Sequence, residues 1–261
     1  MEVDQAYTDT AEKWALDYLS EYYGTVGETH CFALKSLHRF FSTYQPPAGG
    51  AKVLDFGGGP ALSHLISAAP KCKEVVFAEF ADDCREHINL WLKRDPAAFD
   101  WRPFFSYVVN TLEGGTEKDV VEREETLRSI LKSVISCDIF KPQPLEDPGP
   151  YDIVFSGLCL EYISPSYDSY RESVAKLAGL LKPGGTLLMR SGENSQSFTH
   201  LGKMMRSIPI SRQFACDCLE SAGLSLTTLD VLPLEAMPAM IIELVPGTTG
   251  EFCVAATKRA T

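Results

Sequence analysis

The tract over residues 53–60 restricts the fold of this chain more than any other. An apolar run leads into three consecutive glycines and a proline, and a helical pattern follows over residues 61–68. Gly57 and Gly59 have no Cβ, so the backbone can turn sharply and a ligand can approach it closely. Proline suits the first position of a helix, where free N–H groups attract an anion. The tract therefore predicts a strand, a tight turn and a helix that together bind a nucleotide-like ligand.

The spacing around this turn excludes two common nucleotide sites. A dinucleotide site needs a third glycine where this chain has Leu62, and a P-loop needs a Gly-Lys-Ser/Thr sequence that is absent. The turn resembles that of class I methyltransferases, which bind S-adenosylmethionine (SAM) and release S-adenosylhomocysteine. An acid that accepts hydrogen bonds from both ribose hydroxyls is expected roughly twenty residues further on, at the end of the next strand. Glu79 ends the apolar run 74–79, so we predict that Gly57, Gly59 and Glu79 bind SAM.

Composition and charge restrict the partners of the protein. The 261 residues are 45% hydrophobic, which predicts one globular domain over residues 1–261. The net charge of −11 disfavours nucleic acid and anionic lipid as partners. No apolar run has the length of a membrane span, and the acidic N-terminus does not resemble a signal peptide. The eight cysteines are scattered without a C-x-x-C pair, so we expect a cytoplasmic monomer without a metal site.

Strand and helix patterns alternate along the chain, which predicts a parallel sheet with helices on both faces. No helical pattern separates the last two strands, so an antiparallel edge is expected. The charged segment 111–134 is expected to be a helical insertion, and Lys182–Gly185 a helix stop and turn. The predicted strands are 53–56, 74–79, 104–109, 151–156, 186–190, 224–232 and 251–257, and the predicted helices are 11–23, 29–41, 61–68, 82–93, 166–181 and 211–222.

Six tracts, in order along the chain and including the glycine turn, resemble the family that holds nicotinamide, phenylethanolamine and indolethylamine N-methyltransferases. The resemblance implies an α/β, Rossmann-like class I methyltransferase fold. It implies a seven-stranded, mostly parallel sheet with an antiparallel edge strand and an N-terminal helical lid over residues 1–45. The tracts are residues 17–23, 55–60, 91–101, 137–138, 158–165 and 181–185.

The same resemblance implies roles for individual residues. Tyr18 and Tyr23 would close over SAM with their hydroxyls, and Asp138 would contact the adenine amino group. Cys84 stands where the family often has asparagine, which weakens the transfer of that contact. The residues expected to bind SAM are Tyr18, Tyr23, Gly57, Gly59, Glu79, Cys84, Asp138, Ile139 and Gly157.

Methyl transfer to an amine needs a base, because the nitrogen must be neutral before it attacks. Glu161 is the candidate, since it follows the fourth predicted strand, where open parallel sheets bind their ligands. Glu193, in the loop expected after the fifth strand, is a second carboxylate for the amine. The residues expected to bind the substrate are Tyr18, Tyr162, Arg190 and Glu193.

The prediction is therefore a SAM-dependent N-methyltransferase acting on a small amine or an aromatic N-heterocycle. Arg190 leaves an alternative open, because a buried guanidinium needs a partner. That partner is either an internal acid such as Glu193 or a carboxylate on the acceptor, such as a pyridine carboxylate or an amino acid. An O- or S-methyltransferase of the same fold is a further alternative. A non-catalytic SAM-binding protein is disfavoured by the intact glycine turn and Glu161.

Overall fold

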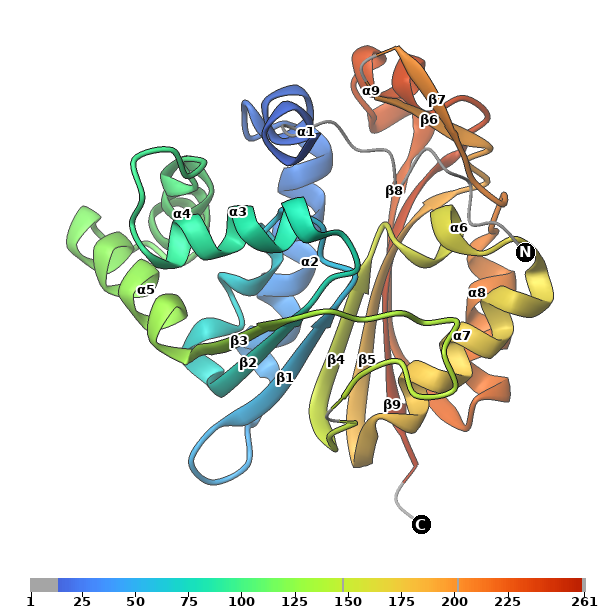
Figure 1. Ribbon diagram of the computed structural model, residues 1–261, viewed down its shortest axis with the longest axis horizontal. Helices are drawn as coiled ribbons and strands as arrows, with labels where there is room; N and C mark the ends of the chain where they lie inside the picture. The colour runs from blue at the N-terminus through green and yellow to red at the C-terminus, as the bar shows by residue number, and fades with distance from the viewer. Residues whose placement is uncertain (1–13, 147, 201, 260–261) are drawn as a thin grey trace. The chain divides into compact units, whose positions relative to one another are not determined.

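The structure is a computed structural model that describes residues 14–146, 148–200 and 202–259 (Figure 1). Seven strands form one sheet in the order β3-β2-β1-β4-β5-β9-β8. The pairs β2–β3, β1–β4 and β4–β5 are parallel, whereas β9 runs antiparallel to both β5 and β8. The predicted fold class is confirmed. The strands are Ala51–Phe56 (β1), Cys72–Ala78 (β2), Leu131–Ile135 (β3), Tyr151–Gly157 (β4), Leu181–Glu193 (β5), Leu224–Pro233 (β8) and Gly250–Lys258 (β9).

The chain divides into two compact units, which are described separately. Unit 1 comprises the chain up to Ala51 and Gly58–Ser136, and unit 2 comprises Lys52–Gly57 and Cys137–Thr261. The single methyltransferase domain expected over residues 1–261 stays a prediction. No helix in the described ranges is both long enough and apolar enough to span a bilayer.

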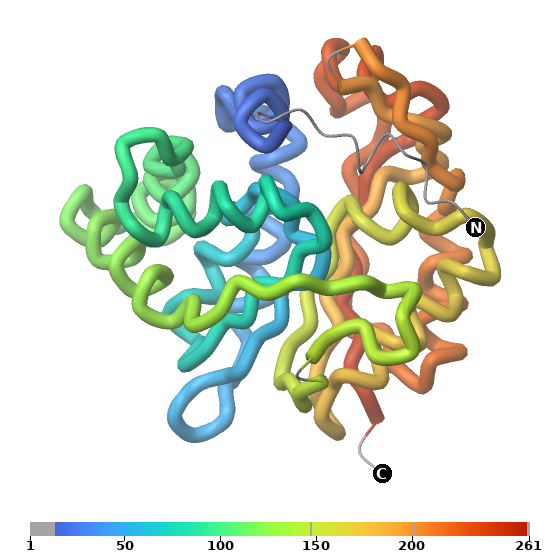
Figure 2. Tube along the Cα trace, in the orientation of Figure 1, coloured from blue at the N-terminus to red at the C-terminus, as the bar shows by residue number. Residues whose placement is uncertain are grey.

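Unit 1 holds β2, β3 and five α-helices, and the course of its chain can be followed in Figure 2. The helices expected at 11–23, 29–41 and 82–93 are present, although residues 11–13 and the first part of the lid lie outside the described residues. Helix α5 falls within the charged segment 111–134, of which residues 131–134 belong to β3. The helices are Trp14–Tyr23 (α1), Glu28–Thr43 (α2), Asp82–Leu92 (α3), Arg102–Ser106 (α4) and Glu117–Ile130 (α5).

The strand predicted at 104–109 is wrong. Helix α4 and a π-helix, Tyr107–Leu112, occupy this segment. Its β-branched and aromatic residues favour a strand locally. However, the buried positions are 104, 105, 108 and 109, which is the spacing of a helix face rather than the alternation of a strand. Burial of that face overrides the local preference, and β3 takes the place of the predicted strand.

The helix predicted at 61–68 is also wrong. Two short 3-10 helices, Ser63–Leu65 and Ala69–Lys71, follow the glycine turn instead. Leu65 N–H donates to the carbonyl of Leu62 at 3.0 Å, an i to i−3 bond. The turn is therefore followed by 3-10 helices rather than by the N-terminus of an α-helix. The anion site predicted at that N-terminus is not formed.

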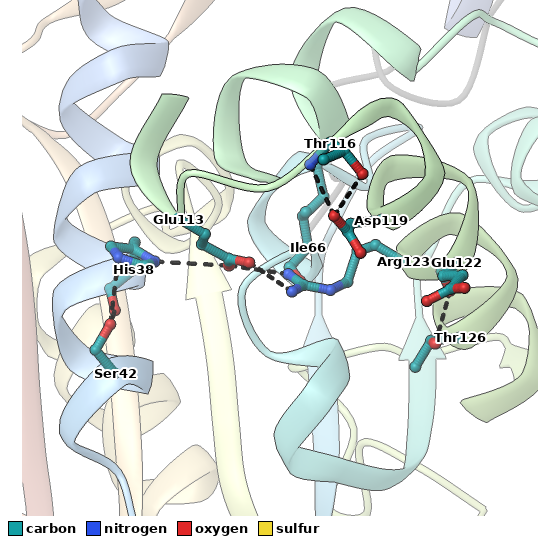
Figure 3. Close-up of polar contacts among 9 residues, drawn as sticks. All are labelled: His38, Ser42, Ile66, Glu113, Thr116, Asp119, Glu122, Arg123 and Thr126. Atoms are coloured by element: carbon teal, nitrogen blue, oxygen red, sulfur yellow. Dashed lines mark hydrogen bonds and ion pairs between the residues drawn. The ribbon is translucent and has the colours of Figure 1, made fainter. Parts of the chain in front are cut away.

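A polar network holds this segment after the turn (Figure 3). Arg123 of α5 donates from Nη1 to the carbonyl of Ile66 at 3.1 Å. The same guanidinium binds both carboxylate oxygens of Glu113, at 3.0 and 2.6 Å. His38 of α2 lies 3.8 Å from Glu113. The network thus ties α2 and α5 to the backbone that follows the glycine turn.

Unit 2 holds the remaining strands and four α-helices. Helices α7 and α8 pack against one another, and α8 also packs on β8 and β9 (Figure 1). The prediction that no helix separates the last two strands is wrong. Helix α9 lies between β8 and β9 in the chain and packs beside β6 (Figure 2). Lys182–Gly185 lies inside β5 rather than in a turn. The elements not yet bounded are Leu160–Ile163 (α6), Tyr167–Gly179 (α7), Arg212–Ser221 (α8), Ala239–Leu244 (α9), and the hairpin of Ser197–His200 (β6) and Lys203–Arg206 (β7), which was not predicted.

Candidate active site

Glu79 follows the last residue of β2 and is fixed by two backbone N–H groups. Gly59 N–H donates to its Oε2 at 2.9 Å, and Ala81 N–H donates to its Oε1 at 2.8 Å. Its own N–H donates to the carbonyl of Ile135 at 3.0 Å, which joins it to the end of β3. The side chain is buried. The carboxylate is therefore held in one orientation before any ligand binds.

A side chain is disfavoured at Gly57 and at Gly59 for different structural reasons. Both have positive φ, +70° at Gly57 and +59° at Gly59. A Cβ on Gly57 would overlap the Sγ of Cys159, whereas a Cβ on Gly59 would meet nothing within 4 Å. Gly57 is required by packing inside unit 2. Gly59 leaves open space beside the Glu79 carboxylate, which fits a ligand that approaches the backbone there.

Cys84 of α3 is buried near Glu79. Burial raises the pKa of the Cys84 thiol well above its usual value, and the charge of Glu79 raises it further. The thiol is therefore protonated and can act only as a weak donor. Arg85 donates to the carbonyls of Glu79 and Phe80, each at 2.6 Å, which fixes the backbone after β2.

Helix α1 brings the two predicted tyrosines into a cluster of aromatic rings. The Tyr18 ring lies 6.0 Å from that of Tyr23, which meets Trp101 edge-on at 5.4 Å. At its start, the N–H of Ala15 donates to the carboxylate of Asp83 in α3 at 2.6 Å. The helix is thus held by ring packing and by one cap in unit 1.

Asp138 and Ile139 lie in a loop of unit 2 that α7 holds in place. Asp138 Oδ1 accepts a hydrogen bond from Phe140 N–H at 3.0 Å. Lys176 of α7 donates to the carbonyl of Ile139 at 2.7 Å, and the Ile139 side chain is buried. Gly157, also predicted to bind SAM, is the last residue of β4.

Glu161 lies on α6 and is the most buried acid in the candidate site, with 2% of the residue exposed. Ser191 Oγ donates to its Oε1 at 2.9 Å, and Gly192 N–H donates to the same oxygen at 3.3 Å. Burial raises the pKa of Glu161 to about 7, although both hydrogen bonds act in the opposite direction. A carboxyl group of this kind can take up and release a proton near neutral pH.

The position of Glu161 follows from the unequal lengths of β4 and β5. The last residue pair between these strands is Gly157 with Arg190. Strand β5 continues for three residues beyond it, so the N–H of Gly192 is not used by β4 and binds Glu161. Ser191 and Gly192 were not among the predicted site residues, although both directly follow the strand predicted at 186–190.

Arg190 pairs with an internal acid, as one of the two predicted alternatives holds, but this acid is Glu251 rather than Glu193. Arg190 donates to both carboxylate oxygens of Glu251 on β9, from Nε at 2.6 Å and from Nη2 at 3.0 Å. Glu193 lies 3.1 Å from Nε of Arg212 and also accepts the N–H of Arg212. Glu193 is the last residue of β5 rather than part of a loop.

Tyr162 follows Glu161 on α6 and packs against the hairpin. Its ring meets that of Phe198 edge-on at 4.8 Å. Its hydroxyl would lie 3.7 Å from a Cβ placed on Gly192. Tyr162 and Glu161 therefore flank the same glycine. Within the described ranges, no three histidine, cysteine or acidic residues gather where they could hold a metal ion.

Comparisons with known proteins give the family and the fold that this chain resembles. The NNMT/PNMT/TEMT family matches residues 5–259. Human nicotinamide N-methyltransferase is 33% identical over 225 residues, which are 83% of each chain. Rat phenylethanolamine N-methyltransferase is 30% identical over 86% of this chain and 78% of its own. The solved structure of the N-methyltransferase NodS from Bradyrhizobium japonicum WM9 shares the fold, with a TM-score of 0.55 at 10% identity over 99% of both chains.

Proposed function

The chain belongs to the NNMT/PNMT/TEMT family, and we propose that it methylates the nitrogen of a small amine or an aromatic N-heterocycle, with Glu161 as the base for an amine acceptor. It is a SAM-dependent N-methyltransferase. The observation that carries the assignment of the base is the buried Glu161 carboxyl, whose pKa burial raises to about 7. The amine and the role of Glu161 are the proposed parts.

The base is needed because an aliphatic amine is protonated at neutral pH and has no free lone pair. Glu161 takes a proton from the ammonium group, directly or through one water; the N–H bond breaks and its electrons remain on nitrogen. The Ser191 hydroxyl and Gly192 N–H hold the carboxylate during this transfer. SAM, when bound, supplies the methyl group on a positively charged sulfur. Glu161 is then neutral while the methyl group moves, and its proton leaves to solvent before the next turnover, so that one proton is released for each methyl group transferred.

Each unit carries its own residues proposed to contact SAM. In unit 1, Gly59 supplies open backbone and Glu79 a fixed carboxylate for the ribose hydroxyls. Tyr18, Tyr23 and Cys84 are proposed as further contacts from the same unit. In unit 2, the proposed contacts are Gly57, Asp138, Ile139 and Gly157.

The pairing of Arg190 with Glu251 supports an amine substrate rather than an acceptor that carries a carboxylate. Its guanidinium makes two charge-assisted hydrogen bonds with Glu251, and both side chains are largely buried. A substrate carboxylate would have to compete with this bidentate pair. We therefore rank pyridine carboxylates and amino acids below simple amines, and propose that Tyr162 and Glu193 contact the acceptor.

The class of partner is proposed from the net charge of the chain. A net charge of −11 disfavours association with phosphate backbones, so a small molecule rather than a nucleic acid is the proposed partner. We further propose that the enzyme acts in the cytoplasm as a monomer.

The test is a screen of small amines, pyridines and pyridine carboxylates with labelled SAM. We expect labelled product from amines, and a loss of turnover in Glu161→Gln with SAM affinity retained. Labelling confined to carboxylate-bearing acceptors would replace the proposed substrate by the alternative. Labelling at oxygen or sulfur would contradict the proposed nitrogen acceptor.

A further inference from the structure

The Arg190–Glu251 ion pair lies directly beside the strand position that holds Glu161. Gly192 is opposite Glu251 in the register of β5 and β9, and its N–H donates to Glu161 at 3.3 Å. Arg190 is two residues earlier on β5, so it shares the face of Gly192. Because residue 192 is a glycine, it contributes no side chain that could screen the carboxylates of Glu161 and Glu251 from one another.

The negative charge of Glu251 acts on Glu161, and Arg190 offsets that charge. The negative charge of Glu251 raises the pKa of Glu161 in addition to burial. Arg190 is protonated at every accessible pH and neutralises that charge through two hydrogen bonds. A buried pair is screened weakly by solvent, so changing one partner changes the field at a neighbouring group.

The other titratable groups around Glu161 stay neutral or are paired. Burial raises the pKa of Tyr170 on α7 well above its usual range, and raises the pKa of Cys218 on α8 to about 11. The pKa of the Cys216 thiol is raised by burial as well. Glu193 is paired with Arg212. Two further titratable side chains lie next to Glu161 in the sequence, Cys159 and Tyr162, and Tyr162 packs against Phe198.

We propose that Arg190 and Glu251 are positioning residues that set the proton affinity of Glu161 across strands β5 and β9. In this role Arg190 serves the base electrostatically rather than by binding the substrate. The kinetic consequence rests on the proposed function of Glu161, whereas the electrostatic effect can be measured without catalysis.

The experiment compares Glu251→Gln with the double variant Arg190→Met/Glu251→Gln. Glu251→Gln leaves the Arg190 cation uncompensated, so the pKa of Glu161 should fall by about one unit. Removing both charges should return it to nearly the wild-type value. The matched control is Asp152→Asn, which breaks the Lys182–Asp152 pair at the opposite end of β4 and should not move it.

Two readouts separate this proposal from the proposed function. The first is the unfolding free energy of each variant minus that of its Glu161→Gln counterpart, followed against pH, which reports the pKa of Glu161 without turnover. The second is the midpoint of the acid limb of kcat/KM. If the midpoint shifts too, kcat/KM at pH 6 should rise about fivefold in Glu251→Gln relative to its plateau.

An unchanged pKa of Glu161 in Glu251→Gln, or a double variant that matches the single one, would overturn the proposal. A shift in the stability readout without a shift in kcat/KM would support the electrostatic role and contradict Glu161 as the base. If Glu251→Gln does not fold, Arg190→Met tests the same coupling with the opposite sign. It leaves the negative charge of Glu251 uncompensated, so the pKa of Glu161 must be higher than in the double variant.

Discussion

Glu79 and Glu161 are two buried acids placed near the ends of parallel strands, one in each unit, and their surroundings differ. Glu79 receives one backbone N–H on each carboxylate oxygen. Glu161 receives a hydroxyl and an N–H on a single oxygen, and burial raises its pKa to about 7. We therefore propose that the same residue type serves as a fixed hydrogen-bond acceptor at Glu79 and as a proton carrier at Glu161, according to the donors around each.

The largest expected effect, which tests whether Glu161 and Glu79 have separate roles, is on turnover. Glu161→Gln keeps the shape but cannot accept the proton, so kcat should fall about 100- to 10,000-fold with SAM affinity unchanged. Steady-state kinetics at saturating SAM measures this loss, and calorimetry measures the affinity. Glu79→Gln is the matched control and should alter SAM affinity more than kcat. If both variants lost kcat equally, the two acids would not have separate roles.

The second effect is on stability against pH. A carboxyl group whose folded pKa is about 7 binds more protons than in the unfolded chain, where the pKa is near 4.3. Its contribution to stability is fully present below pH ~4.3 and is lost as the pH rises through about 7, by about 3 kcal/mol. Urea unfolding of wild type and Glu161→Gln should therefore diverge by that amount between pH 4 and pH 8. Parallel curves would show that the folded pKa of Glu161 is not raised.

The third effect sharpens the role of Glu79. Glu79→Ala removes the charged acceptor proposed for the ribose hydroxyls, and such hydrogen bonds are worth about 1.5–3 kcal/mol. SAM affinity should then fall about tenfold or more, as calorimetry would show. Asp152→Asn provides a control outside the proposed contacts. Wild-type affinity in Glu79→Ala would remove the ribose assignment.

The smallest effect concerns helix α1, which belongs to the same unit as Glu79. Asp83→Ala removes the acceptor of Ala15 N–H, and loss of such a cap costs about 1 kcal/mol. Hydrogen exchange over residues 14–23 should speed up a few-fold. Adding S-adenosylhomocysteine should slow exchange there in wild type if α1 is a lid. Equal exchange with and without it would mean that α1 is simply packed.

The sequence predicted those parts of the fold in which local pattern and tertiary packing agree. The long apolar runs of β1, β2 and β4 have no competing helical pattern, and all three strands are present. At 104–109 the residues favour a strand but bury a helical face, and nothing local reveals which preference dominates. The 3-10 turns after Gly59 depend on Arg123, which lies 57 residues from its acceptor Ile66.

The candidate site was predictable only where chain position determines it. Glu79 and Glu161 follow strands, so topology alone suggested both. Ser191 and Gly192 reach Glu161 because β5 extends beyond β4, and strand length cannot be read from one sequence to within three residues. Glu251 was missed because its partner depends on the antiparallel register of β5 and β9.

The fit between Gly57 and Cys159 has a consequence for the evolution of the chain. A methyl group at position 57 would overlap the Cys159 sulfur, and its backbone φ of +70° strains any other residue. An alanine at 57 is therefore strained by its backbone, at a cost of about 1 kcal/mol or more, and needs the Cys159 side chain to move or to be replaced by a smaller one. The two positions, 102 residues apart, are therefore expected to be epistatic: Gly57→Ala should cost less stability where residue 159 is smaller.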